Sequence, residues 1–262
     1  MDYKKTIAAL AVAATTAAMA DGIVSSSVVG YNNTDSTASG KKMMSGSFIS
    51  VGANKTYNLT DLKVDTDGEA CSGEFVLQTL DTYGRTDKSY YWYYDRTHGI
   101  RSGVAGWYDA DGLVQFIDEN DVSFTSGQAF WTQGSGFKLV SAGEVLTATV
   151  SVPTSASGKV QIGNPYPVAV KLTDLTVDTD GENCSGEFVM QTLDTYGRTD
   201  KSYYWYYDRR HGKNSGTAGW YDADGEVAFT EDDGVVLNPG EGYWVQGSGF
   251  TLEFPKLTLN ND

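Results

Sequence analysis

Apolar and polar residues alternate over short segments of this chain, and turn residues separate the segments. Glu144–Val152 is the clearest example, because Leu146, Ala148, Val150 and Val152 would share one face of an extended strand. Clusters of Gly, Asp, Asn and Ser interrupt the pattern at the short intervals that are typical of β proteins. No long segment shows the period of an amphipathic helix. The pattern therefore predicts an all-β fold.

Two segments carry a run of consecutive aromatic residues. Lys88–Asp95 and Lys201–Asp208 both read KSYYWYYD. A strand of this kind is either covered on both faces or presents one aromatic face to a ligand. Further along, Gly106–Gly112 and Gly219–Gly225 both read GWYDADG, and the Asp-Gly pair predicts a hairpin with a type I′ turn.

These matches belong to one long internal repeat. Leu62–Gly112 and Leu175–Gly225 are identical at all but seven positions, and 113 residues separate them. Upstream, the short strand at Phe48–Gly52 aligns with the one at Val160–Gly163. A repeat of this length predicts two homologous antiparallel β-sandwich or barrel-like modules in tandem.

The repeat divides the chain into six predicted segments. These are a signal peptide at 1–20, a leader strand and polar loop at 21–45, a first module at 46–145, a connecting strand or linker at 146–157, a second module at 158–258 and a C-terminal tail at 259–262. We expect the leader strand over Ile23–Tyr31, followed by a loop. It pairs either with its own module or with a sheet edge of a neighbouring molecule.

The first residues have the three parts of a secretory signal. Lys4 and Lys5 precede the apolar run Ile7–Ala18, and Ala18-Met19-Ala20 predicts cleavage after Ala20. The apolar run is too short to span a bilayer. We therefore expect a secreted protein, extracellular or held at the cell surface, with no membrane insertion.

The formal net charge of −15 excludes the partners that a basic protein would bind. So acidic a surface repels nucleic acid and anionic lipid. Catalysis has little support either, because the two histidines, His98 and His211, occupy the same position of the repeat and no nucleophile motif accompanies them. We expect a protein that is not an enzyme and needs no cofactor, with calcium as the one candidate ion.

Calcium is a candidate because acidic side chains recur in a turn that contains glycine. The sequence DTDGE supplies alternate carboxylates, which a hard cation prefers. The candidate metal residues are Asp65, Asp67, Glu69, Asp178, Asp180 and Glu182. The alternative is a solvated acidic β-turn, and the spacing does not fit an EF-hand loop.

The tryptophans have two interpretations. Rigid aromatic rings stack on the apolar faces of sugars, so one set in each module could bind a glycan with avidity. Burying the same rings would stabilise a small β core. The candidate ligand-binding residues are Trp92, Trp107, Trp131, Trp205, Trp220 and Trp244.

The two cysteines, Cys71 and Cys184, also occupy one position of the repeat. If the modules pack about a local two-fold axis, these residues are candidates for a disulfide between modules. Disulfides between molecules and two free thiols are the alternatives.

Two short motifs carry a resemblance to a known group of proteins. GNPYP at Gly163–Pro167 lies upstream of G-x-G-[YF]-W-V-Q at Gly240–Gln246, with aromatic strands and acidic turns between them. This order resembles a repeat module of secreted surface proteins of Gram-negative bacteria, of the Bacteroidetes and the Planctomycetes–Verrucomicrobia–Lentisphaerae type.

The resemblance implies a non-catalytic extracellular structural or adhesion protein that binds itself or other surface proteins. Glycan binding through the aromatic faces, with calcium as a helper, is the alternative.

Overall fold

The computed structural model describes residues 28–37, 40–81, 85–94, 104–117, 122–134, 136–194, 196–207 and 217–258. Over these residues the chain is all-β, which confirms the predicted fold class. Its helical segments there are single 3-10 turns, at Leu59–Asp61 (η1), Leu172–Asp174 (η2) and Glu231–Asp233 (η3). Neighbouring strands run antiparallel in every sheet.

We call residues 28–145 the first half and residues 146–258 the second half. The first half has a six-stranded sheet in the order β2-β10-β5-β6-β7-β8, a three-stranded sheet β1-β11-β4 and a pair β3-β9. Its strands are β1 (Val29–Asp35), β2 (Lys42–Ser45), β3 (Thr56–Asn58), β4 (Leu62–Asp65), β5 (Cys71–Leu80), β6 (Thr86–Tyr94), β7 (Gly106–Tyr108), β8 (Gln115–Phe116), β9 (Ser123–Thr125), β10 (Ala129–Gln133) and β11 (Lys138–Glu144).

The second half is built in the same way. A five-stranded sheet runs β13-β20-β16-β17-β18, beside a three-stranded sheet β12-β21-β15 and a pair β14-β19. Its strands are β12 (Val150–Pro153), β13 (Val160–Gly163), β14 (Val170–Lys171), β15 (Thr176–Asp178), β16 (Cys184–Leu193), β17 (Thr199–Tyr207), β18 (Gly219–Tyr221), β19 (Val236–Leu237), β20 (Gly242–Gln246) and β21 (Thr251–Phe254). Each of these sheets is open at both ends, so the barrel-like alternative is wrong for the described strands.

Matched positions of the repeat have matched backbone and burial. β5 and β16 each have ten residues and show the same order of buried and exposed side chains. Each pairs with the aromatic strand, β6 or β17, in the same register, with irregularities at the same two places. The aromatic strands are covered where their tryptophans lie, because Trp92 and Trp205 are buried.

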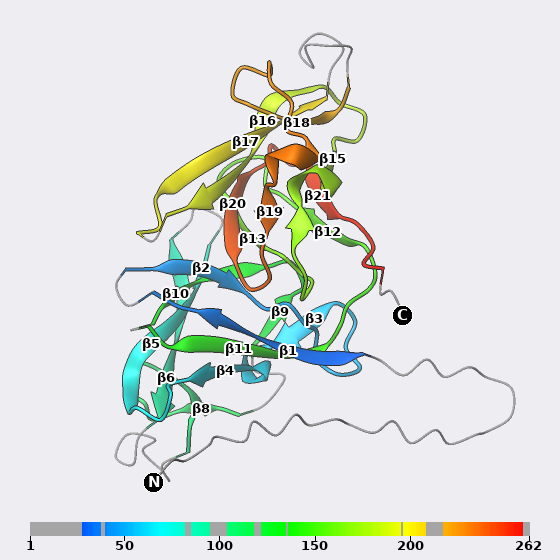
Figure 1. Ribbon diagram of the computed structural model, residues 1–262. Helices are drawn as coiled ribbons and strands as arrows, with labels where there is room; N and C mark the ends of the chain where they lie inside the picture. Colours follow the sequence, from blue (N-terminus) through cyan, green and yellow to red (C-terminus); the bar gives the residue numbers. More distant parts are fainter. Residues whose placement is uncertain are drawn as a thin grey trace, which may run out of the picture.

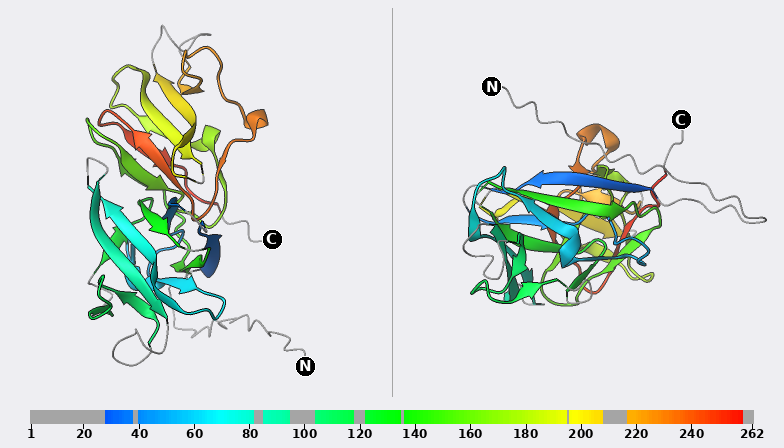
Figure 2. Two further views of the ribbon diagram at one scale, coloured as in Figure 1. Left: turned by 90° about the vertical axis from the view of Figure 1, so that its left-hand side faces the viewer. Right: turned by 90° about the horizontal axis from the view of Figure 1, so that it is seen from below.

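Each half has its own large hydrophobic core, and Ile49 of the first half packs into the core of the second. Phe75 on β5 and Leu139 on β11 belong to the core of the first half, so both of its larger sheets contribute to that core. Phe188 on β16 and Leu252 on β21 do the same in the second half. Figures 1 and 2 show the halves stacked along the long axis of the molecule, with β2 and β10 of the first half next to β13 and β20 of the second.

The predicted leader strand needs one correction, at its end, and residues 23–27 of it lie outside the described part of the chain. β1 extends from Val29 to Asp35, so it includes polar residues that the sequence assigned to a loop. It pairs along its whole length with β11 of the same half. Backbone pairing at a sheet edge does not need apolar side chains, which is why the hydrophobic pattern missed it. β12, within the predicted connecting segment, pairs in the same way with β21.

The upstream alignment of the repeat was also wrong. Ser45 pairs with Ala129 and Gly163 pairs with Gly242, and Ala129 and Gly242 are one position of the repeat. β2, with the sequence KMMS, is therefore the equivalent of β13, in place of the segment at Phe48–Gly52. Sequence similarity could not reveal this match, because the two strands share only a place in the sheet.

A type I′ turn is present, but it does not lie at the predicted hairpin. The hairpin at Gly106–Gly112 forms, but of Asp111 and Gly112 only the glycine has positive φ, at 67°, so the turn is not type I′. The acidic turn takes that geometry instead, with φ of 52° at Asp67 and 83° at Gly68.

Candidate functional site

The two halves meet through two backbone hydrogen bonds that join equivalent positions of the halves in opposite directions. The amide of Ser45 donates to the carbonyl of Gly240 at 3.0 Å, and the amide of Gly163 donates to the carbonyl of Gly127 at 2.9 Å. Ser45 is equivalent to Gly163, and Gly240 is equivalent to Gly127. One contact therefore becomes the other when the halves are exchanged, which is the property of an isologous two-fold interface.

A small apolar cluster lies at this junction. The rings of Trp131 and Trp244, which are one position of the repeat, meet edge to face with centroids 6.2 Å apart. Met43, Ala129, Leu80 and Leu193 complete the cluster. The residue that contacts its own equivalent lies on the pseudo-two-fold axis, so these two tryptophans mark the axis.

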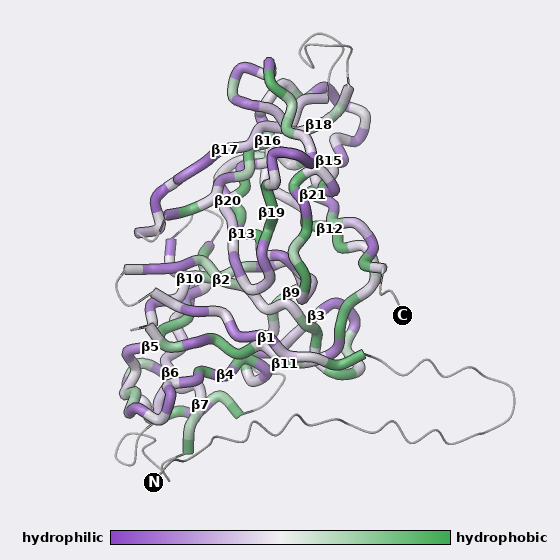
Figure 3. Tube along the Cα trace, in the orientation of Figure 1, coloured by the Kyte–Doolittle hydropathy of each residue, from purple (hydrophilic) through white to green (hydrophobic). Residues whose placement is uncertain are grey.

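Beside the axis lies a cleft of about 610 Å³ that both halves line. The first half contributes Asp35, Ser36, Thr37, Lys42 and Met43. The second half contributes Thr192, Leu193, Asp194, Asp200, Lys201, Tyr203, Val236, Asn238, Glu241, Gly242 and Tyr243. We call this space the junction cleft. Residues of β17 and β19 line the cleft, and Figure 3 shows that the chain is hydrophilic along the outer part of β17 and hydrophobic at β19.

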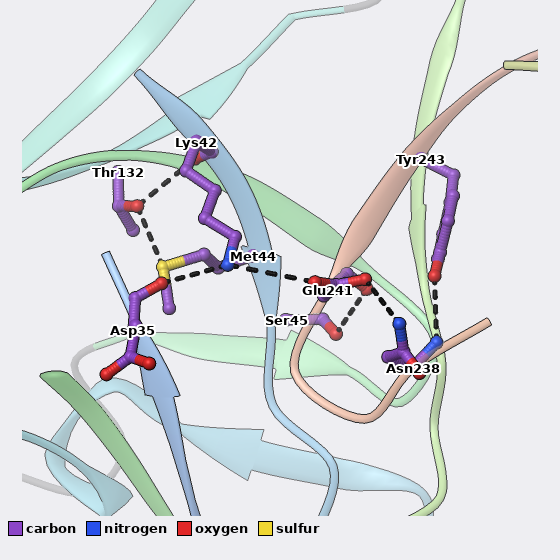
Figure 4. A network of polar contacts seen from close by, with 8 residues as sticks. All are labelled: Asp35, Lys42, Met44, Ser45, Thr132, Asn238, Glu241 and Tyr243. Atoms are coloured by element: carbon purple, nitrogen blue, oxygen red, sulfur yellow. Dashed lines mark hydrogen bonds and ion pairs between the residues drawn. The ribbon is translucent and has the colours of Figure 1, made fainter. Parts of the chain in front are cut away.

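Lys42 connects the halves on one side of the cleft (Figure 4). Its ammonium donates to the carbonyl of Asp35 at 2.9 Å and lies 3.8 Å from the carboxylate of Glu241 in the other half. The amide nitrogen of the Asn238 side chain donates to the same carboxylate at 3.0 Å. Lys42 and Glu241 are partly exposed, so a ligand in the cleft can reach both charges.

Two tyrosines form the less polar part of the cleft. The hydroxyl of Tyr243 accepts a hydrogen bond from the backbone N–H of Asn238 at 2.9 Å. Burial, and then the charge of Glu241, raises the pKa of Tyr243 well above its ordinary value. Burial and then Asp200 raise the pKa of Tyr203. Both phenols are protonated at neutral pH, as an unperturbed tyrosine also is.

The junction cleft is lined by charged and hydroxyl side chains. Four carboxylates and two ammonium groups line it, with hydroxyl groups between them, and its described lining includes no histidine or cysteine. The hydroxyl of Ser36 donates to the carbonyl of Gly134 at 3.2 Å, so no base activates it in the described residues. The arrangement can hold a polar molecule through mixed donors and acceptors.

Four of the six tryptophans predicted to stack on sugars lie inside the protein. Trp92, Trp107, Trp205 and Trp220 are between 1% and 4% exposed. Within each half they pack edge to face in pairs, with centroids 5.2 Å apart for Trp92 and Trp107. Trp131 and Trp244 pack at the junction. The structure gives the four core rings no surface on which a sugar could stack.

The predicted calcium residues do not converge in the described part of the chain, where no group of three or more acidic, histidine or cysteine side chains is placed to hold a metal. Asp65, Asp67 and Glu69 are exposed, and so are Asp178, Asp180 and Glu182. The carboxylate of Asp65 accepts the amide of Asp67 at 2.9 Å, and the pair Asp178 and Asp180 repeats this contact. These bonds cap the acidic turn, as in the solvated-turn alternative.

The predicted disulfide between modules is wrong. Cys71 and Cys184 are both free and buried, and each lies in the core of its own half. Each thiol lies 3.2 Å from the carbonyl of the tryptophan across the hairpin, Trp92 or Trp205. The pseudo-two-fold axis passes through the tryptophans of β10 and β20 instead, so the cysteines do not meet.

We expect both thiols to be unreactive in the folded protein. Burial raises the pKa of the Cys71 and Cys184 thiols, which disfavours the thiolate that alkylating agents attack. Iodoacetamide should leave the native chain unlabelled and label it twice in concentrated guanidinium. Intact mass spectrometry with and without a reductant checks this, and a mass that rises on reduction would contradict it.

The motif GNPYP has a structural role here. Asn164 is fully buried, and its side-chain N–H groups donate to the carbonyls of Val168 at 2.7 Å and Leu237 at 2.9 Å. The hydroxyl of Tyr166 lies 2.7 Å from the carbonyls of Ala148 and Pro255. The motif thus ties the start of the second half to its end.

Several predictions fall outside the described residues. The signal peptide at 1–20, His98 and His211 are among them. Among the helices of the described part, none has the length and apolar character needed to cross a membrane.

Sequence reasoning missed the junction cleft. Its lining comes from eight separate stretches of the chain, and polar residues such as Asp200 and Lys201 look like ordinary surface side chains. One signal was available, because Asp-Lys followed by an aromatic strand occurs in both copies.

No family model matches this chain, and searches of characterised proteins and of solved structures found no match either.

Proposed function

We propose that this chain is a non-catalytic extracellular structural or adhesion protein that holds its partner in the junction cleft. The observation that carries the proposal is the cleft itself, a polar space of about 610 Å³ lined from both halves. Space of this size is typical of a site for a small ligand or for one segment of a larger one.

The isologous junction supports this role. Its backbone hydrogen bonds and apolar cluster hold the two walls of the cleft in a fixed relation without occupying the cleft. Pre-organised walls lose little entropy on binding, so modest contacts suffice for affinity. The partner would be a surface glycan, another surface protein or a second copy of the chain.

Glycan binding is the second candidate, and the cleft favours it over the tryptophans. Carboxylates, ammonium groups and hydroxyls lie next to the apolar atoms of Leu193 and Val236 in one space. Sugars present both kinds of surface to a protein. The candidate glycan site is therefore the junction cleft and not the tryptophans of the two cores.

Filling the cleft should abolish partner binding. Val236 is 39% exposed and lines the cleft, so Val236→Trp should occupy the space and weaken binding at least about tenfold, while leaving the fold intact. Val227→Trp is the matched control, because Val227 is 62% exposed in the same half and does not line the cleft.

The measurement is biolayer interferometry against immobilised neutral and charged polysaccharides, extracellular matrix proteins and the chain itself. Partner recovered afterwards should have an unchanged mass. Equal binding by Val236→Trp and the parent would place the partner elsewhere, and a cleaved partner would make the protein an enzyme.

A further inference from the structure

The same set of residues lines a hollow in each half. In the junction cleft the set is Thr192, Leu193, Asp200, Lys201 and Tyr203. A second cavity, of about 260 Å³, is lined by Thr79, Leu80, Asp87, Lys88 and Tyr90, which are the equivalent positions of the repeat. We call this space the first-half cavity. A surface feature that appears twice with the same five side chains is a property of the module.

The backbone fixes the set in the same way in both halves. The amide of Lys88 donates to the hydroxyl of Thr79 at 3.2 Å, and the amide of Lys201 donates to that of Thr192 at 3.1 Å. Each bond ties the start of the aromatic strand to the end of its neighbour. The side chains of Asp87 and Lys88 are exposed, and so are those of Asp200 and Lys201. They are therefore available to a ligand.

The tyrosine of each set is a buried hydrogen-bond donor. Tyr90 and Tyr203 are each 4% exposed. Burial and then the neighbouring carboxylate, Asp87 or Asp200, raise the pKa of each phenol. The carboxylate and the phenol of each set line the same hollow.

The two hollows differ in their outer walls. In the junction cleft the other half adds residues between Asp35 and Met43, whereas the described lining of the first-half cavity comes from the first half alone. Glu241 of the cleft is replaced by Gln128 in the cavity. The cleft thus surrounds a ligand on more sides and offers an additional charged acceptor.

Charge selects the class of ligand. An anionic ligand would face four carboxylates in the junction cleft and a chain of net charge −15. A cationic ligand would meet these carboxylates but also the ammonium groups of Lys42 and Lys201, so neither sign of charge is matched throughout the cleft. A neutral polyol can donate hydroxyls to the carboxylates and accept from the ammonium groups, with its C–H face on Leu193 and Val236.

We propose that the repeated set is a sugar-binding half-site, so that one chain binds a neutral oligosaccharide at two places, more tightly in the junction cleft than in the first-half cavity. The inference for the tighter site, in the junction cleft, rests on the proposed function. The weak site does not, because it needs no contribution from the second half. Two sites of one chemistry on one rigid chain would bind a long glycan with avidity.

Isothermal titration calorimetry of the full chain tests this, with maltotriose, cellotriose, laminaritriose and mannotriose as neutral probes. We expect at least one of them to occupy two sites of unequal affinity. Asp200→Asn should weaken the tight site about tenfold or more, and Asp87→Asn should weaken the loose site alone, since hydrogen bonds to a charged group contribute more than neutral ones. Asp232→Asn, at an exposed position outside both hollows, is the control and should change neither.

Charged trisaccharides from chitosan and polygalacturonate should bind more weakly than the neutral ones. Stronger binding of either, a single site, or no sugar binding at all would overturn the inference. If Val236→Trp then still abolishes binding of a different partner, the proposed function stands and only the sugar assignment falls. If sugar binds to Val236→Trp and the parent alike, the proposed cleft function falls.

Discussion

Replacing Trp107 by alanine should destabilise the first half by about 3–5 kcal/mol, the cost of removing a large buried aromatic ring. Trp107 is 1% exposed, and its ring meets those of Trp92 and Phe75. Its indole N–H donates to the carbonyl of Leu62 at 2.7 Å. The substitution leaves a cavity and removes a buried hydrogen bond, so both effects act in the same direction.

Because each half has its own core, the unfolding of each half should be measurable separately through the exposure of its cysteine. Urea titrations should be followed by alkylation of the two cysteines and peptide mass spectrometry. In Trp107→Ala, Cys71 should become reactive at a lower urea concentration than Cys184, and Trp220→Ala should reverse that order. Weakened partner binding with unchanged urea midpoints would instead support a role for these tryptophans in ligand stacking.

A second pair of variants separates packing from hydrogen bonding. The indole N–H of Trp92 has no partner among the described residues, unlike that of Trp107. Trp107→Phe and Trp92→Phe remove similar volumes, but only the first loses a hydrogen bond. Trp107→Phe should therefore be the more destabilising of the two by about 1 kcal/mol.

Trp107 also shows how far the sequence could predict this fold. Strand alternation, aromatic runs and the repeat predicted the β class, because these signals arise from local geometry and burial. The sequence could not decide whether the tryptophans lay in the core or at a surface, since either position suits an aromatic side chain. That choice depends on which residues of the other sheet cover β6. One of them is Leu139 on β11, and β11 is distant from β6 in the chain.

The junction was less predictable than the sheets. β2 and β13 have dissimilar sequences, KMMS and VQIG, yet they occupy equivalent places because their backbones pair with equivalent strands. Backbone pairing leaves little trace in the side chains of short strands. The junction cleft depends on that pairing, so its residues could be recognised only after the halves had been placed against each other.

Gly163→Ala should open the junction and remove the cleft. A Cβ at this position would lie 2.1 Å from the Cβ of Ser45 in the other half, a separation at which something must move. Ser45 is buried and hydrogen-bonded through its backbone, so it cannot yield without breaking the contact with Gly240. Overpacking of this kind costs about 1–3 kcal/mol, and here the cost falls on the junction alone.

The expected result is faster hydrogen exchange at the amides of Ser45 and Gly163, a larger radius of gyration in solution scattering and at least about tenfold weaker binding of any cleft partner. Thiol protection in both cores should persist. Gly219→Ala is the control, because the Cβ there would meet its nearest neighbour, Tyr221, at an ordinary 3.5 Å.

A second substitution should relieve this clash. The atoms nearest to the new methyl group are Cβ and Oγ of Ser45, so Ser45→Gly combined with Gly163→Ala transfers the side chain from one side of the axis to the other. If the junction is a pseudo-two-fold contact, the double variant should recover the parent's exchange rates and binding, with a coupling energy of about 1–3 kcal/mol between the two sites. Additive losses in the double variant would mean that the halves do not meet at these residues, and the junction cleft would lose its geometric basis.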